Sequence, residues 1–366
     1  MTSSPFAGLC RSARWRAFFL AACLSSPAHA HGEWIDVHVH PVVGKGATPE
    51  AVDQTAQTLL QIMDNHNIRQ AVIMPLPNPA QAAVVFNEHV ASIGAKHAPR
   101  LAFLGSGTLN MLLDKASRLE SVPDEFRQKF EAVAEAQIAR GAIGFGEIAA
   151  LHVSHTPTHH FIQTPPDHPL LLLLADIAAR HDVPIDLHCD PVAEDMATPG
   201  KLISPRNPPQ LKGNLAAIER LLAHNRKAVI VWAHLGSHPT DALSPKLAGE
   251  LLERHPNLYF SIRPFGGNEA TDLVNARGGI NNRSWLPLLH AYPDRFVIGT
   301  DSFIVAHDFT GNDAPRTLSM GGRKNRDGVS TLLAALPDDL ARKIGYENAI
   351  RIYKLKPAGP RGAVLP

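Results

Sequence analysis

The sequence predicts an α/β fold, a single-domain (β/α)₈ TIM barrel, and three observations support this prediction. Short runs rich in β-branched residues alternate with longer helical patterns, which is typical of a parallel sheet built from βα units. Eight such runs are present, the number of strands that closes a barrel of this type. No low-complexity linker divides the chain after its first thirty residues, so one large domain is expected within the 366 residues.

The eight runs expected to form strands are spread along the whole predicted domain. They are residues 34–40, 71–77, 100–107, 142–148, 183–190, 228–236, 258–265 and 296–303. Amphipathic segments such as residues 50–67, 125–141 and 169–181 lie between them, and several end in Gly, Asn or His, where a helix stops. A doubly wound open sheet is the structural alternative, but no glycine-rich phosphate-binding fingerprint follows the first strand.

The first thirty residues are typical of a secretory signal rather than of a folded segment. Three arginines precede the apolar run AFFLAACL, and the small-residue site AHA ends at Ala30. The apolar run is too short to cross a bilayer, so no stable membrane insertion is expected. We therefore expect cleavage of residues 1–30 to leave a periplasmic or secreted domain of residues 31–366. A lipoprotein acylated at Cys23 is the alternative, and the intact mass of the exported protein decides between them.

The charge of the predicted mature chain excludes two classes of partner. The signal segment carries three of the 35 basic residues and none of the 34 acidic ones, so the mature chain is slightly acidic. It therefore has no basic excess to attract nucleic acid or an anionic membrane. Of the three cysteines, Cys189 alone would remain, so no intrachain disulfide is possible. Stability must come from a large core or from metal.

Polar residues occupy the first expected strand, WIDVHVH, which is otherwise typical of a buried strand. Side chains alternate along a strand, which places Asp36, His38 and His40 on one face. The other face, expected to meet the helices, carries Ile35, Val37 and Val39. The polar face would then point into the barrel near the C-terminal end of the strand, where the active sites of such barrels lie.

Four other expected strands carry further potential metal ligands at or near their C-terminal ends. These are Glu147 at the end of the fourth strand, His188, His234 and Asp301. Each has an ordinary structural explanation alone, such as a buried histidine satisfied by hydrogen bonds or an aspartate that caps the next segment. Burying six such imidazoles and carboxylates without a cation would carry a large desolvation penalty. Together they predict a divalent metal site.

The ordered series DVHVH, GEI, LHCD, AHLG and GTDSF resembles the amidohydrolase superfamily, especially its amidohydrolase-related branch and, in part, the phosphotriesterase-like and TatD-type enzymes. The resemblance extends to the terminal ENAIRIYKL, which is similar to the closing helix of that branch. It implies two divalent cations with Glu147 as a bridge between them. In this resemblance the first cation would be bound by His38, His40 and Asp301. The second would be bound by His188 and His234. Many superfamily members use a carboxylated lysine as the bridge, and this chain has no lysine at that position.

A mononuclear site is the alternative interpretation. It would be made by His38, His40, His188 and Asp301, with His234 as a hydrogen-bond donor to the substrate. Imidazole and carboxylate ligands suit zinc, and manganese is a further candidate for the one or two cations. A cation so held lowers the pKa of bound water to roughly 7. Asp301 would accept the water proton and later deliver it to the leaving group.

Two residues are expected to contact the substrate. Arg263, at the end of the seventh strand, would bind a carboxylate or phosphoryl oxygen, with a salt bridge at the rim as the alternative, and His152 would line the pocket from a loop after Glu147. Loops rich in Pro and Gly are expected at residues 191–213 and 304–328, where they would shape specificity. Cys189 alternates away from His188, which favours a packed thiol over a ligand.

The sequence therefore predicts a metal-dependent hydrolase that cleaves a C–O or C–N bond in a small ester, lactone or amide. A metal-dependent lyase, either a decarboxylase or a hydratase, is the nearest alternative enzyme. A non-catalytic periplasmic metal-binding protein is the third possibility, but it would place its histidines on loops rather than on strands. The acidic mature chain disfavours a nuclease.

Overall fold

The computed structural model describes residues 32–358 except 45, 78–81, 158, 203, 236–238, 266–272, 274–279, 282 and 306–315. The predicted signal segment therefore lies outside the described residues, and its cleavage stays a prediction. Of the described helices, none combines the length and the apolar character needed to cross a membrane.

Eight principal parallel strands form the centre of the described chain. They are β1 (Trp34–Val42), β2 (Ile68–Ile73), β3 (Leu101–Phe103), β4 (Phe145–His152), β6 (Pro184–Cys189), β9 (Val229–Leu235), β10 (Leu258–Ile262) and a last strand in two parts, β11 (Phe296–Ile298) and β12 (Ser302–Val305). They pair in the orders β12-β1-β2-β3 and β11-β10-β9-β6-β4. Backbone hydrogen bonds connect the two sheets at both edges, from Gly105 to Gly144 and from Asp301 to His38, each 3.0 Å long. The predicted (β/α)₈ barrel is confirmed.

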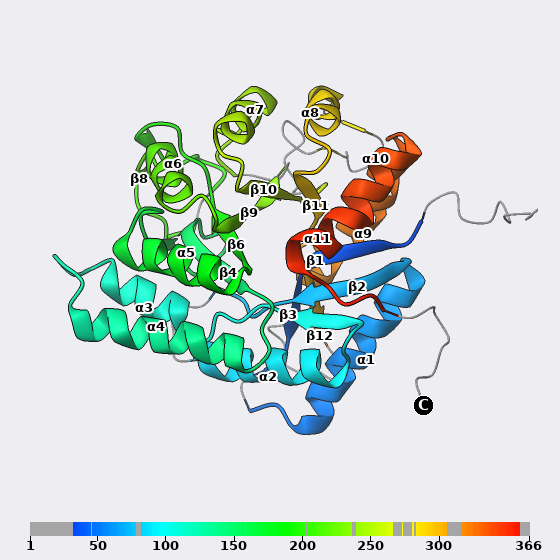
Figure 1. Cartoon of the computed structure of the whole chain (residues 1–366), viewed down its shortest axis with the longest axis horizontal. Helices are drawn as coiled ribbons and strands as arrows, with labels where there is room; N and C mark the ends of the chain where they lie inside the picture. The colour runs from blue at the N-terminus through cyan, green and yellow to red at the C-terminus, as the bar shows by residue number, and fades with distance from the viewer. Residues whose placement is uncertain are drawn as a thin grey trace, which may run out of the picture. The chain divides into compact units, whose positions relative to one another are not determined.

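Helices follow the strands and surround them on the outside (Figure 1). They are α1 (Pro49–Asn65), α2 (Ala82–Lys96), α3 (Leu109–Ala116), α4 (Asp124–Ala139), α5 (Pro169–His181), α6 (Leu215–His224), α7 (Pro245–Arg254), α8 (Leu286–Ala291), α9 (Arg316–Ala334), α10 (Asp338–Arg342) and α11 (Asn348–Tyr353). The three helices predicted in most detail are present as α1, α4 and α5. Local sequence explains where several begin: Thr48 and Ser244 cap α1 and α7 through their hydroxyls, and each is followed by a proline.

Two apolar layers hold the barrel together. The larger layer lies between strands and helices and includes Phe130, Leu174 and Trp232. A smaller cluster joins residues from the early parts of several strands, including Ile35 and Val231, to residues of the closing helix α11. The predicted closing helix therefore packs at the N-terminal end of the strands, and the C-terminal end is left for the polar residues.

The predicted faces of β1 are wrong for Ile35, Asp36 and Val37, and right for His38, Val39 and His40. The pairing of β1 with β2 shifts register between Asp36 and Val39, which is the signature of a β-bulge. Ile35 and Val37 belong to the cluster that contains α11, whereas Asp36 and Val39 line a small cavity together with residues of α1. Asp36 therefore points away from the metal ligands, although His38 shares the barrel interior with Ile35 and Val37.

Two other predictions of local structure are also corrected. Strand β4 does not end at Glu147 but continues to His152, where it pairs with the short antiparallel β5 (Ile162–Gln163). The segment 304–328 was predicted as a loop, but residues from Arg316 onward form helix α9, since the amphipathic pattern there outweighs three glycines. The other predicted loop, 191–213, contains two short paired strands, β7 (Met196–Ala197) and β8 (Gln210–Leu211).

One glycine allows the last strand to approach the first. Gly299 follows β11, and a Cβ atom there would lie 2.9 Å from His38 Cβ and 2.9 Å from Ser261 Oγ. Real side chains do not tolerate such contacts, so a residue without a Cβ is required at this position. The approach brings Asp301 next to the two histidines of β1.

Candidate metal centre

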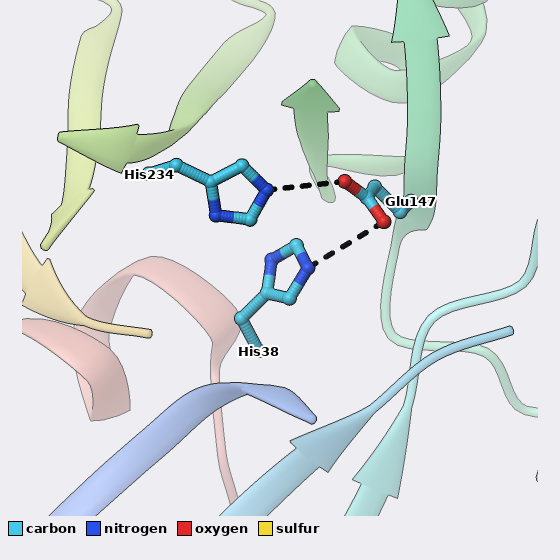
Figure 2. A group of neighbouring side chains, drawn as sticks. All are labelled: His38, Glu147 and His234. Atoms are coloured by element: carbon cyan, nitrogen blue, oxygen red, sulfur yellow. Dashed lines mark hydrogen bonds and ion pairs between the residues drawn. The ribbon is translucent and has the colours of Figure 1, made fainter. Parts of the chain in front are cut away.

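The carboxylate of Glu147 lies between four imidazole rings. Its Oε1 is 2.6 Å from His188 Nδ1 and 3.2 Å from His234 Nε2. Its Oε2 is 3.3 Å from His40 Nε2 and 3.6 Å from His38 Nε2. Figure 2 shows this carboxylate with one oxygen directed at His234 and the other at His38. Each oxygen therefore serves one pair of histidines, as a bridging carboxylate would.

Asp301 lies on the side of the two histidines of β1. Its Oδ1 is 3.3 Å from His40 Nε2 and 3.9 Å from His38 Nε2, and those two nitrogens are 3.1 Å apart. Its Oδ2 is 3.1 Å from a terminal nitrogen of Arg263. The six residues predicted as ligands are thus all brought together, from β1, β4, β6, β9 and the turn between β11 and β12.

Backbone irregularities aim the side chains of this centre. The register of β4 shifts between Phe145 and Ile148, on either side of Glu147, as that of β1 does around His38. His234 and Asp301 have φ angles of 70° and 53°, in the left-handed region that residues with a Cβ rarely adopt. Such strained residues cluster at functional sites.

In His38 and His40, the ring nitrogen Nδ1 faces away from the metal centre and lies near an oxygen atom. His38 Nδ1 is 3.2 Å from Asp186 Oδ1, and His40 Nδ1 is 3.0 Å from the carbonyl oxygen of Met74. The hydrogen bond from His40 Nδ1–H to Met74 leaves the lone pair on Nε2, which faces the centre, whereas His38 Nδ1 lies near the Asp186 carboxylate without a hydrogen bond to it. Asp186 accepts a 3.4 Å hydrogen bond from the hydroxyl of Tyr353, so α11 contacts the residues behind the site.

His188 is held in the opposite orientation. Its Nε2 lies 3.6 Å from Asp190 Oδ2, and that carboxylate oxygen accepts a 2.8 Å hydrogen bond from the backbone N–H of Val153. His188 therefore presents Nδ1 to Glu147. Sequence reasoning missed Asp186 and Asp190, although the segment IDLHCD places both two residues from His188 and hence on the same face of the strand.

Charges inside the site perturb its pKa values strongly. Burial alone would lower the pKa of His188, but the Asp190 and Glu147 carboxylates outweigh it and raise that pKa to about 10. For Glu147 the opposite holds: burial favours the neutral acid, yet His38 and His188 hold its pKa well below the ordinary value. The pKa of His234 is lowered to about 3, chiefly by burial. Shifts in opposite directions within one cluster are typical of functional sites.

The residues present suit a divalent cation. One ligand atom from each of His38, Glu147 and His234 lies within 4.8 Å of the others, and the same holds for His38, His40 and Asp301. His40 is hydrogen-bonded through its outer nitrogen, and His38 and His188 each have a carboxylate within 3.6 Å of theirs, which resembles the support behind metal-binding histidines. All of these groups are buried or nearly so, and nitrogen and carboxylate oxygen are the donors that zinc prefers.

The two predicted substrate-binding residues both lie beside this centre. Arg263 follows β10 and is paired with Asp301 rather than free. His152 is the last residue of β4, not a loop residue, and its ring centroid is 4.5 Å from that of His188. Its Nδ1 is 2.9 Å from the carbonyl oxygen of His160, and the ring of His159 lies 4.3 Å away. Cys189 is buried in the helix-facing layer, as predicted.

The fold and the centre define a (β/α)₈ barrel enzyme with a histidine and carboxylate site at the C-terminal ends of its strands. The chain belongs to the amidohydrolase family, whose model matches residues 35–355. The members of this family are enzymes that act on small molecules and typically use divalent metals. No curated protein sequence matches the chain.

Solved structures with a similar fold were also found. They include a 2,6-dihydroxybenzoate decarboxylase in complex with 2,6-dihydroxybenzoate, at 16% identity and a TM-score of 0.47, with 88% of this chain and 100% of that chain covered. A probable 2-pyrone-4,6-dicarboxylic acid hydrolase from Acinetobacter baumannii is 12% identical, with a TM-score of 0.48 and with 88% of this chain and 99% of that chain covered. An amidohydrolase from Pseudomonas aeruginosa is 11% identical, with a TM-score of 0.49 and with 89% of this chain and 97% of that chain covered.

We predict that Asp186→Asn weakens the binding of zinc by about 10- to 100-fold, because His38 loses the negative charge 3.2 Å behind its ring. The dissociation constant for Zn²⁺, measured by competition with a chelator, checks this. Asp195→Asn is the matched control, since Asp195 is an exposed partner of Lys212. Equal affinity in the Asp186 variant and the control would show that Asp186 does not support the metal site.

Proposed function

We propose that the protein is a metal-dependent hydrolase that cleaves a C–O or C–N bond in a small ester, lactone or amide. The observation that carries the proposal is the position of Glu147 between two pairs of imidazoles, with Asp301 beside one pair. A divalent cation bound there would act as a Lewis acid and lower the pKa of a water molecule. The predicted signal segment would direct this activity to the periplasm or the medium.

The protein groups have separate tasks in this proposal. His38, His40, His188 and His234 would hold the cations through neutral rings. Asp301 accepts the proton of the attacking water and returns it to the leaving group. Arg263 lies beside Asp301 and His152 beside His188, where the guanidinium would bind an anionic oxygen of the substrate and the neutral imidazole would accept or donate a hydrogen bond. Burial lowers the pKa of His152 to about 4, so its ring is neutral near pH 7.

A metal-dependent lyase is the second candidate, and the ion pair of Arg263 with Asp301 favours it. The guanidinium weakens Asp301 as a base and would also hold the carboxylate of an acidic substrate. Incubation of the metal-loaded protein with a panel of lactones, esters and amides and a second panel of aromatic carboxylic acids separates the two. Water consumption with the first panel supports the hydrolase, and release of carbon dioxide from the second supports the lyase.

We predict that Asp301→Asn reduces turnover on the order of 10²–10⁴-fold, because the amide cannot accept a proton. The fold should be intact, since the amide keeps the shape of the side chain. The measurement is kcat on the substrate identified by the panel, alongside circular dichroism and metal content. Undiminished kcat with a normal metal content would remove Asp301 from the mechanism.

We also predict that Glu147→Gln lowers the metal content from two cations per chain to about one. Without the bridging charge, two dications would repel each other at short range. Elemental analysis of wild type and variant after gentle dialysis measures this. One cation in fully active wild type would establish a mononuclear site, whereas two cations retained in the variant would show that Glu147 does not bridge them.

A further inference from the structure

Asp36 is a buried carboxylate that the proposed reaction does not use. It is fully inaccessible to solvent and, because of the bulge in β1, lies on the opposite side of the strand from His38 and His40. A buried carboxylate is costly unless several donors stabilise it, so its partners indicate what it does.

The carboxylate of Asp36 connects the backbones of two segments that carry metal ligands. Its Oδ1 accepts hydrogen bonds from the backbone N–H groups of His38, at 3.3 Å, and of Thr300, at 3.0 Å. Thr300 directly precedes Asp301, whose own N–H donates to the carbonyl oxygen of His38 at 3.0 Å. One side chain thus fixes the separation of His38 and Asp301 from behind.

A chain of hydrogen bonds extends from this carboxylate to helix α9. Thr300 Oγ1 donates to Asp36 Oδ2 at 2.6 Å and lies 2.6 Å from Ser302 Oγ, and Arg326 donates to Ser302 Oγ at 2.9 Å. The single proton of the Thr300 hydroxyl is used on Asp36, so Ser302 must be the donor to Thr300. The chain therefore runs in one direction, from a guanidinium through two hydroxyls to a carboxylate.

The hydrogen-bonded side chains are shielded from solvent and packed closely together. Thr300, Ser302 and Arg326 are all buried. A Cβ atom on Gly322 would lie 3.0 Å from both the Arg326 guanidinium and Ser302 Oγ, so the glycine lets α9 approach the strand at this point. Hydrogen bonds in such a low-dielectric setting are strong and polarise one another.

We propose that Asp36, Thr300, Ser302 and Arg326 form a positioning network that sets the distance between His38 and Asp301 and thereby the affinity of the site for metal. This proposal rests on the metal site of the proposed function. The four residues contact neither metal nor substrate, and they act through the backbones of His38 and Asp301. Helix α9 is thereby coupled to the site through Arg326.

The test is the dissociation constant for Zn²⁺ of purified variants, measured by competition with a chelator. Thr300→Val removes the hydroxyl and keeps the backbone donor, and it should weaken binding roughly tenfold, within the range for residues behind metal ligands. Ser302→Ala interrupts the chain nearer Arg326 and should weaken binding less. Thr300→Ser keeps the hydroxyl, so this variant should bind Zn²⁺ about as tightly as the wild type.

Ser261→Ala is the matched control for this series. Ser261 is equally buried and lies against Gly299, but its hydroxyl has no hydrogen-bond partner among the described residues. The control should keep the wild-type affinity even where its melting temperature shifts, which separates positioning from general stability.

The outcomes distinguish this proposal from the one on which it rests. A wild-type chain that binds no divalent cation would overturn both. Tight binding by the wild type with the same affinity in Ser302→Ala, once circular dichroism shows that this variant is folded, would overturn the network and keep the metal site. This holds even if Thr300→Val does not fold. An equal loss in Ser302→Ala and Ser261→Ala would also overturn the network.

Discussion

The structure of the site depends on one constraint: a buried carboxylate, Glu147, must be neutralised by the imidazoles around it. Taking this charge out of water is unfavourable unless cations or proton donors face both of its oxygens. The barrel meets the requirement by bringing β1, β6 and β9 together around β4, so that each oxygen faces a pair of rings. A bound divalent cation would satisfy the same requirement without protonated histidines.

The same requirement applies one layer further out. The outer nitrogens of the rings around Glu147 also have polar neighbours: the carbonyl oxygen of Met74 is hydrogen-bonded to His40, and the carboxylates of Asp186 and Asp190 lie 3.2 and 3.6 Å from His38 and His188. Behind Asp186 lies Tyr353 of the closing helix, whose other neighbours are apolar residues of the barrel interior. The polar site therefore lies next to a cluster of apolar residues. Because these residues exclude water, the electrostatic interactions of the site are strong.

Much of this could be predicted from the sequence, because the strands are marked by β-branched runs and the ligands by histidines and acids at their ends. The β-bulges could not, since a strict alternation of side chains is the only pattern that the sequence of β1 offers, and the bulge at Asp36 breaks it. Asp186 and Asp190 were visible in IDLHCD but needed the orientation of His188 to be interpreted. Helix α9 was not predicted, because its three glycines are typical of a loop. One of them, Gly322, allows the helix to approach Ser302.

The two oxygens of Asp301 have different neighbours, and this difference bears on its proposed role. Oδ1 faces the histidines of β1, whereas Oδ2 is paired with Arg263. Burial alone would raise the pKa of Asp301, but the charge of Arg263 outweighs it and holds the pKa well below the ordinary range. A carboxylate in this state is a weak base and, once protonated, a strong acid. Within the proposed hydrolase cycle, the ion pair would therefore disfavour acceptance of the water proton and favour its return to the leaving group. Acceptance of the proton depends on the lowered pKa of the water itself, so Asp301 and the cation would each make up for what the other lacks.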